Sequence, residues 1–376
     1  MNNIELFINN RLEKREDDFS IRKLTKTFPP IDFCSNDYLG LSRSSELKKL
    51  IDKNLLNIKN YKNGAAGSRL LSGNTTYTEE TEQFIANYHK AESGLIFNSG
   101  YDANVGLLSS LPQRGDTIIT DELIHASIID GCRLSHATRY KFSHNNIEDL
   151  TEKLKLSKGN IFVVVESVYS MDGDLAPLKE ISLLCQTYNA ALIVDEAHAL
   201  GIFGENGTGL VNHLNLQNKI FARIVTFGKA LGVHGAIVLG NKNLRNYLIN
   251  FARSFIYTTA APMQNIVSIK SAYILLGKIN LKSISDKINL FRKLIKENNI
   301  KALESPSAIQ GILFSSNAET KNAASLLQSK GFDVRAILSP TVPVGKERLR
   351  ICLHSYNTDQ EITSLINNLK EIQNNG

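Results

Sequence analysis

The segment IVTFGKALG, from Ile224 to Gly232, places a lysine directly after an apolar run. Lysine side chains lie mostly at protein surfaces, because a buried ammonium group is costly unless it is paired or neutralised. Lys229 nevertheless follows what the pattern predicts to be a buried strand. Two interpretations compete. Either the side chain extends from a turn with its amine in water, or the amine is needed inside a site, where it can form a Schiff base.

Short apolar runs rich in β-branched residues lie on both sides of this segment. They cover residues 94–97, 116–120, 160–167, 190–198, 222–227 and 234–240. Amphipathic helical patterns separate several of them, at 146–156 and 177–189. Continuous apolar strands alternating with helices predict an α/β fold whose mostly parallel sheet is covered by helices on both faces. Such sheets bind ligands at the carboxyl ends of their strands.

The pattern changes after about Pro262. Two helical stretches are followed by short strands at 308–314, 333–338 and 347–354, with a helix between them and another at the end. We therefore predict three parts. An N-terminal arm covers residues 1–40, a large domain covers 41–262, and a smaller α+β domain covers 263–376.

Composition and charge exclude several classes of protein. Hydrophobic residues make up 42% of the 376 residues, which is ample for a large core. The 43 basic and 37 acidic residues give a net charge of +6, and they are scattered, so no nucleic-acid partner is predicted. The four cysteines are far apart, as in reduced cytoplasmic proteins, and no apolar run approaches the roughly 20 residues that span a bilayer. We expect a cytoplasmic protein without a membrane partner or a metal site.

Several polar residues fall at or just beyond the predicted strand ends. Asp195 and His198 close VDEAH, and Ser170 lies in SVYSMDGDLAPL. His125 follows another strand, and Gly100 in NSGYDAN lies at a strand-to-helix junction where free N–H groups favour a phosphate. Each motif alone has an ordinary structural explanation, as a solvated turn, a loop or a structural histidine. Together they match the needs of one cofactor.

Pyridoxal 5′-phosphate is that cofactor. It needs a lysine for its aldehyde, an acid beside its ring nitrogen, and hydroxyl and backbone donors for its phosphate. Lys229 and Asp195 provide the first two groups. Thr226, three residues before the lysine, provides a hydroxyl.

Five segments carry a resemblance to a known family: TFGKALG, VDEAH, SVYSMDGDLAPL, SNDYLGL and SPTVPVGKERLR. Together they resemble the α-oxoamine synthases, within the fold type I pyridoxal-phosphate enzymes, over nearly the whole chain from about Arg22. FARSFIYTTAAP (251–262) is most similar to the biotin-pathway branch of the family. The resemblance implies a homodimer with shared active sites, a large domain with a mostly parallel sheet, and a smaller α+β C-terminal domain.

The resemblance also implies a role for each site residue. Lys229 would form the Schiff base, Asp195 would pair with the pyridinium nitrogen, His198 would bond the ring hydroxyl oxygen, and His125 would stack on the ring. The expected phosphate contacts are Ser170, Thr226, Gly100 and Tyr101. The expected substrate contacts are Arg22, Thr341 and Arg350. Thr258 or Thr259 would reach the phosphate of the partner subunit.

The implied activity is a decarboxylative condensation of L-alanine with a pimeloyl thioester, carried on CoA or acyl-carrier protein, to 8-amino-7-oxononanoate. Sister enzymes join glycine to acetyl-CoA (2-amino-3-ketobutyrate CoA ligase) or serine to a long acyl chain (serine palmitoyltransferase), and the cofactor motifs do not separate these. A non-catalytic binding protein with the same fold is a further alternative. Ala65, Ala66 and Ala199 stand where relatives often have Ser, Gly and Gly, which affects loop geometry and removes no chemical group.

Overall fold

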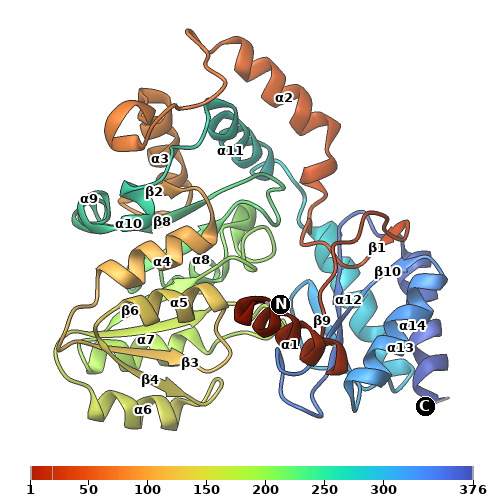
Figure 1. Cartoon of the computed structure of the whole chain (residues 1–376). Coiled ribbons are helices and arrows are strands. Elements are labelled where there is room, and N and C mark those ends of the chain that lie inside the picture. The colour runs from red at the N-terminus through yellow and green to blue at the C-terminus, as the bar shows by residue number, and fades with distance from the viewer. Residues whose placement is uncertain (1, 19, 375–376) are drawn as a thin grey trace. The chain divides into compact units, whose positions relative to one another are not determined.

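The strands on both sides of Lys229 belong to one seven-stranded sheet in the computed structural model, which describes residues 2–18 and 20–374 (Figure 1). The sheet lies in a compact unit, the large unit, formed by Asn36–Ser170 and Asp174–Ile284. Its strands, in spatial order, are β2 (Ser93–Phe97), β8 (Ala236–Gly240), β7 (Ala222–Thr226), β6 (Ala191–Asp195), β5 (Ile161–Glu166), β3 (Thr117–Asp121) and β4 (Thr138–Phe142). Strands β3 to β7 are mutually parallel, and β8 is antiparallel to both of its neighbours.

Helices cover both faces of this sheet (Figure 1). Successive residues of β5 face opposite sides, so Phe162 and Val164 belong to one apolar cluster and Val163 and Val165 to the other. The first cluster contains residues of α4 (Gly100–Ser110), α5 (Ala126–Leu134), α9 (Lys242–Phe251) and α10 (Arg253–Ile256). The second contains residues of α6 (Ile147–Leu156), α7 (Leu178–Thr187) and α8 (Leu210–His213). The predicted α/β fold with a mostly parallel sheet is confirmed.

Three further helices complete the large unit: α2 (Ser45–Leu56), α3 (Thr76–Tyr88) and α11 (Met263–Leu276). The sequence places residues from 263 onward in the C-terminal domain, whereas in the structure α11 belongs to the large unit. Ile266, Val267 and Ile269 of α11 are buried. A helix that is apolar on several sides needs neighbours on those sides, and α2 and α3 provide them.

The second compact unit, the small unit, is formed by Met1–Ser35, Met171–Gly173 and Ser285–Gly376. A short parallel pair joins β1 (Ile31–Asp32) to β10 (Phe332–Asp333). An antiparallel sheet has the order β11 (Arg335–Ile337), β12 (Arg348–Cys352) and β9 (Ile309–Leu313). The helices of this unit are α1 (Asn3–Asp17), most of α12 (Lys282–Glu297), α13 (Asn317–Ser329) and α14 (Asp359–Asn374). Within the described residues, no helix is both long enough and apolar enough to span a bilayer.

Candidate active site

The turn between β7 and β8 fixes the backbone around Lys229. The N–H of Phe227 donates to the carbonyl of Gly235 at 2.9 Å, and the N–H of Val233 donates to the carbonyl of Phe227 at 3.0 Å. The side chain of Lys229 is partly buried, and its Nζ lies 2.7 Å from Nε2 of His198. The amine is therefore directed at another side chain of the unit, which favours the second interpretation of this lysine.

The end of β6 presents Asp195 and His198, each 4% exposed. One carboxylate oxygen of Asp195 accepts the N–H of Ala197 at 2.9 Å, and the other accepts Nδ2 of Asn104 at 2.8 Å. Nδ1 of His198 lies 2.7 Å from the hydroxyl of Tyr38. Both side chains are thus held in place by neighbours on other elements.

His125 is the N-cap residue of α5 and lies at the open edge of the site. Its Nδ1 accepts the N–H of Ser127 at 3.2 Å, so the proton of the neutral ring is on Nε2. Burial lowers the pKa of His125, the charge of Asp195 opposes this effect, and Lys229 adds to it. A neutral imidazole with an exposed face is suited to cover an aromatic ring.

One cavity of about 260 Å³ joins most of the predicted cofactor residues. The residues of the prediction that line it are Gly100, Tyr101, His125, Asp195, His198, Thr226 and Lys229. It lies at the carboxyl ends of parallel strands, where ligands bind such sheets. The structure therefore brings together residues that are up to 129 positions apart in the sequence, from Gly100 to Lys229.

The N-terminus of α4 and the end of β7 form a polar recess in this cavity. A Cβ on Gly100 would lie 2.5 Å from Cγ2 of Thr226, so this position has room only for glycine. The buried Oγ1 of Thr226 has no hydrogen-bond partner within the described residues. A free hydroxyl beside the first N–H groups of a helix fits a phosphate.

Six predicted residues are not among those lining this cavity: Ser170, Arg22, Thr341 and Arg350, together with Thr258 and Thr259, which were assigned to the phosphate of the partner subunit. Ser170 is buried in the large unit, and its main-chain N–H donates to the carboxyl group of Glu166. Arg22, Thr341 and Arg350 belong to the small unit. Arg22 and Thr341 are exposed, and Nη1 of Arg350 lies 3.0 Å from Sγ of Cys352. Their roles toward phosphate or substrate stay predictions.

The structure adds three residues that the sequence did not single out: Tyr38, Asn104 and Glu166. Tyr38 and Asn104 lie in the quoted motifs SNDYLGL and NSGYDAN, so the signal was present without an assignment. Asn104 and Glu166 both line the cavity, and each has one buried side-chain oxygen without a partner among the described residues. Burial and the neighbouring Asp195 raise the pKa of Glu166 to about 8.

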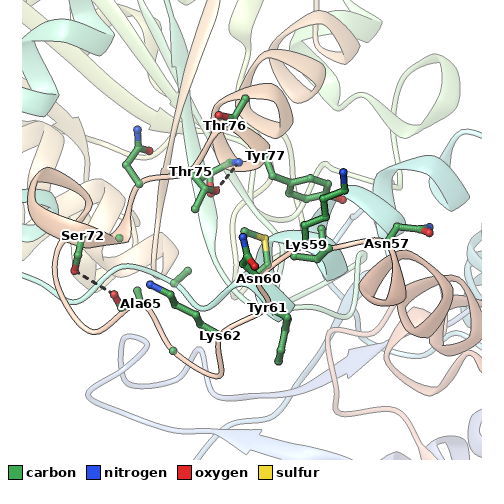
Figure 2. Close-up of a pocket in the computed structure, with 17 residues that line it drawn as sticks. Asn57, Lys59, Asn60, Tyr61, Lys62, Ala65, Ser72, Thr75, Thr76 and Tyr77 are labelled. Carbon is green, nitrogen blue, oxygen red and sulfur yellow. Dashed lines mark hydrogen bonds between the residues drawn. The ribbon is translucent and has the colours of Figure 1, made fainter.

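A larger cavity of about 440 Å³ lies elsewhere in the large unit, between residues 57–65, residues 72–78 and the start of α11 (Figure 2). Lys59, Lys62 and Tyr77 point into this region, but no predicted site residue lines it. The smaller cavity is the candidate active site because it contains the convergent titratable groups. The adjoining loop places Ala66 at a φ of 55°, in the left-handed region that favours glycine.

The fold and the site are those of the fold type I pyridoxal-phosphate enzymes. Comparisons with known proteins support this class. The profile of the family described as aminotransferase class I and II matches residues 29–369. The chain belongs to this family and, within it, to the α-oxoamine synthases. The predicted resemblance is thereby confirmed.

Individual proteins similar to this chain include α-oxoamine synthases of two activities. The 8-amino-7-oxononanoate synthase of Emericella nidulans is 44% identical, over 94% of this chain and 92% of the relative. Among solved structures, the serine palmitoyltransferase of Sphingomonas wittichii has a TM-score of 0.88 at 25% identity, covering 100% of this chain and 98% of its own. The 8-amino-7-oxononanoate synthase of Francisella tularensis has a TM-score of 0.80 at 28% identity. The match covers 92% of this chain and 98% of the Francisella chain.

Proposed function

We infer that the chain is a pyridoxal-phosphate-dependent acyltransferase that condenses L-alanine with a pimeloyl thioester. Carbon dioxide is lost, and the product is 8-amino-7-oxononanoate, as in biotin biosynthesis. One observation carries the chemistry: a single cavity joins the inward-directed amine of Lys229 to the buried carboxylate of Asp195 and to His198. The name of the relative that is 44% identical supports the choice of alanine and pimeloyl thioester over the substrates of the sister enzymes.

The residues of the cavity fit the cofactor group by group. When bound, pyridoxal phosphate supplies an aldehyde for an amine and a ring that delocalises negative charge from a substrate carbon. The carboxylate of Asp195 would hold the ring nitrogen of the cofactor and favour its protonated form. The unpartnered hydroxyl of Thr226 and the N-terminus of α4 would hold the phosphate. His125 would cover one face of the ring.

Lys229 has a second task as the base of the site. Its Nζ, when free, takes the proton from the α-carbon of the amino acid. His198, 2.7 Å away, orients this amine, and His198 is in turn oriented by Tyr38. Two backbone hydrogen bonds of Phe227 close the turn that carries Lys229, and its side chain extends from this turn toward His198.

The remaining roles extend the proposal to the substrates and to the assembly. Arg350 binds the carboxylate of alanine. Arg22 and Thr341 bind the carboxylate at the end of the pimeloyl chain that is distant from the thioester. The protein acts in the cytoplasm as a homodimer, in which Thr258 or Thr259 reaches the phosphate of the partner subunit. Charge-assisted hydrogen bonds from arginine to carboxylates are the physical basis of the two arginine assignments.

The test is a substrate matrix. Purified protein loaded with pyridoxal phosphate is given alanine, glycine or serine with pimeloyl-CoA, pimeloyl acyl-carrier protein, acetyl-CoA or palmitoyl-CoA, and products are identified by mass. We expect 8-amino-7-oxononanoate from alanine and a pimeloyl donor, and no product from a Lys229→Ala control. Efficient use of glycine with acetyl-CoA, or of serine with palmitoyl-CoA, would assign the chain to a sister activity. A protein that takes up no pyridoxal phosphate would be a non-catalytic member of the fold.

A further inference from the structure

Two loops at the carboxyl edge of the large sheet each carry a predicted cofactor residue. The His125 loop, residues 121–125, begins with the last residue of β3 and ends at His125, the N-cap residue of α5. The Ser170 loop, residues 167–176, follows β5 and contains Ser170. Strands β3 and β5 are adjacent and parallel, so the two loops leave the sheet at neighbouring positions.

The carboxyl group of Glu166, the last residue of β5, joins the two loops at one point. It accepts the main-chain N–H groups of both His125 and Ser170. The Ser170 loop is also closed on itself, because the N–H of Tyr169 donates to the carbonyl of Asp174 at 3.0 Å. A movement of one loop past the other would therefore break hydrogen bonds of a buried group.

His144, just after β4, joins the same two loops at a second point. Its Nδ1 lies 3.0 Å from Oδ1 of Asp121 in the His125 loop, and its Nε2 lies 2.7 Å from Oδ2 of Asp174 in the Ser170 loop. Ionised carboxylates only accept hydrogen bonds, so this geometry fits a ring with a proton on each nitrogen. Burial lowers the pKa of His144, but the hydrogen bonds to Asp121 and Asp174 outweigh it and raise the pKa to about 10.

The groups around His144 leave it as the cation between two anions. Asp121 is fully buried and Asp174 is 26% exposed. Tyr169 packs edge-on against the imidazole with ring centroids 4.5 Å apart, and Glu122 accepts the main-chain N–H of His144 at 3.0 Å. Within the part of the chain that the structure describes, no lysine or arginine forms an ion pair with Asp121 or Asp174. Removing the imidazole would thus leave both carboxylates without a cation.

We propose that His144 is a positioning residue that holds the His125 loop and the Ser170 loop in the arrangement that binds the ring and the phosphate of pyridoxal phosphate. The inference rests on the proposed function and on the predicted contact of Ser170 with the phosphate. His144 is not among the residues that line the cavity, so it acts through the two loops. Links at both Glu166 and His144 order the loops before the ligand arrives, and a site ordered in advance loses less entropy on binding.

The test uses the full-length protein loaded with pyridoxal phosphate, together with two variants. His144→Gln removes the cation that joins both loops, whereas Asp174→Ala cuts the link to the Ser170 loop and leaves His144 bonded to Asp121. The phosphorus NMR signal of the bound cofactor reports the surroundings of its phosphate. Circular dichroism in its visible absorption band reports the orientation of its ring. We expect both signals to change in His144→Gln, and the phosphorus signal to change more than the ring signal in Asp174→Ala.

The dissociation constant of pyridoxal phosphate provides a third readout. We expect it to rise about tenfold in His144→Gln, the equivalent of one lost hydrogen bond between charged groups. The matched control is Asp52→Ala, which removes an exposed ion pair to Lys48 on α2 and should behave as wild type in all three measurements. The free energy of unfolding is measured on the same samples.

A role of His144 in stability alone would lower the free energy of unfolding and leave the dissociation constant and both spectra as in the wild type. That result would overturn the inference and leave the proposed cofactor intact. A ring signal that changes in Asp174→Ala while the phosphorus signal does not would also overturn it. A wild-type protein that binds no pyridoxal phosphate would overturn the proposed function and this inference with it. Asp174→Ala keeps the buried pair of Asp121 and His144, so it provides the test if His144→Gln does not fold.

Discussion

Arg223 on β7 forms a buried ion pair whose removal provides a sharp test of the packing beneath the site. The side chain is 3% exposed, and its Nη2 and Nε lie 2.8 and 2.9 Å from Oε2 of Glu196, which is fully buried. Arg223 also donates to the carbonyls of His89 and Thr208, at 3.1 and 3.3 Å. Glu196 is adjacent to Asp195 in the chain, so this network supports the segment that carries the site.

Arg223→Met keeps most of the aliphatic stem and removes the charge and all its hydrogen bonds. Removing one partner of a buried pair costs about 3–5 kcal/mol, because the other charge is left without compensation. Burial raises the pKa of Glu196 and Arg223 opposes that shift, so Glu196 should take up a proton in the variant. The double variant Arg223→Met/Glu196→Gln removes both charges. We expect it to regain a large part of the lost stability.

Urea unfolding followed by circular dichroism measures these free energies. The matched control is Arg133→Met. This variant removes the ion pair between Arg133 and Asp130, in which the side chain of Arg133 is 69% exposed. This control should change the free energy of unfolding by no more than about 0.5 kcal/mol. A loss below about 1 kcal/mol in Arg223→Met, or a double variant less stable than the single one, would refute the reasoning.

Three further predictions concern the site and its surroundings. Borohydride treatment of protein loaded with pyridoxal phosphate should attach the cofactor to Lys229, and peptide mapping that finds it on another lysine would contradict the assignment. His144 lies 3.0 Å from Asp121 and 2.7 Å from Asp174. Burial disfavours its charge, but these hydrogen bonds prevail and raise its pKa from 6.5 to about 10. The resulting stabilisation relative to His144→Gln should be complete below pH 6.5 and decline as the pH rises to about 10, as measured by urea unfolding across that range. Arg22→Ala should raise the KM for pimeloyl thioester roughly tenfold, the loss of one charge-assisted hydrogen bond. An unchanged KM would exclude that role.

The sequence predicts the central strands well because parallel strands buried on both faces are continuously apolar. The runs at 160–167 and 190–198 correspond to β5 and β6. Strand β4 was not predicted, because Thr138–Phe142 is a half-exposed edge strand of mixed polarity without a continuous apolar run. The antiparallel direction of β8 was also not predicted, since an apolar run carries no information about strand direction.

Site residues that lie at the ends of apolar strands could be predicted from the sequence. Site residues that reach the cavity only through packing between different elements could not. Asp195, His198 and Lys229 each lie within four residues of the last apolar residue of a predicted strand. Asn104 lies inside a helix, and its contact with Asp195 exists only because α4 packs across the sheet. The pairing of Glu166 with Asp195 depends on strand order and register, which a single sequence does not specify.

The pairing of β1 with β10 has a consequence for the order of folding during synthesis. Ile31 pairs with Phe332, so β1 is synthesised 301 residues before the strand with which it pairs. All residues of the large unit are available once Ile284 has left the ribosome, whereas the small unit also requires Ser285–Gly376. Since domains fold as units during synthesis, the large unit can fold first, while the strand at Ile31–Asp32 must wait for its partner. A nascent chain stalled at a length that has brought Ile284, but not Phe332, out of the ribosome should therefore protect the central sheet from protease while the first 35 residues are still cut.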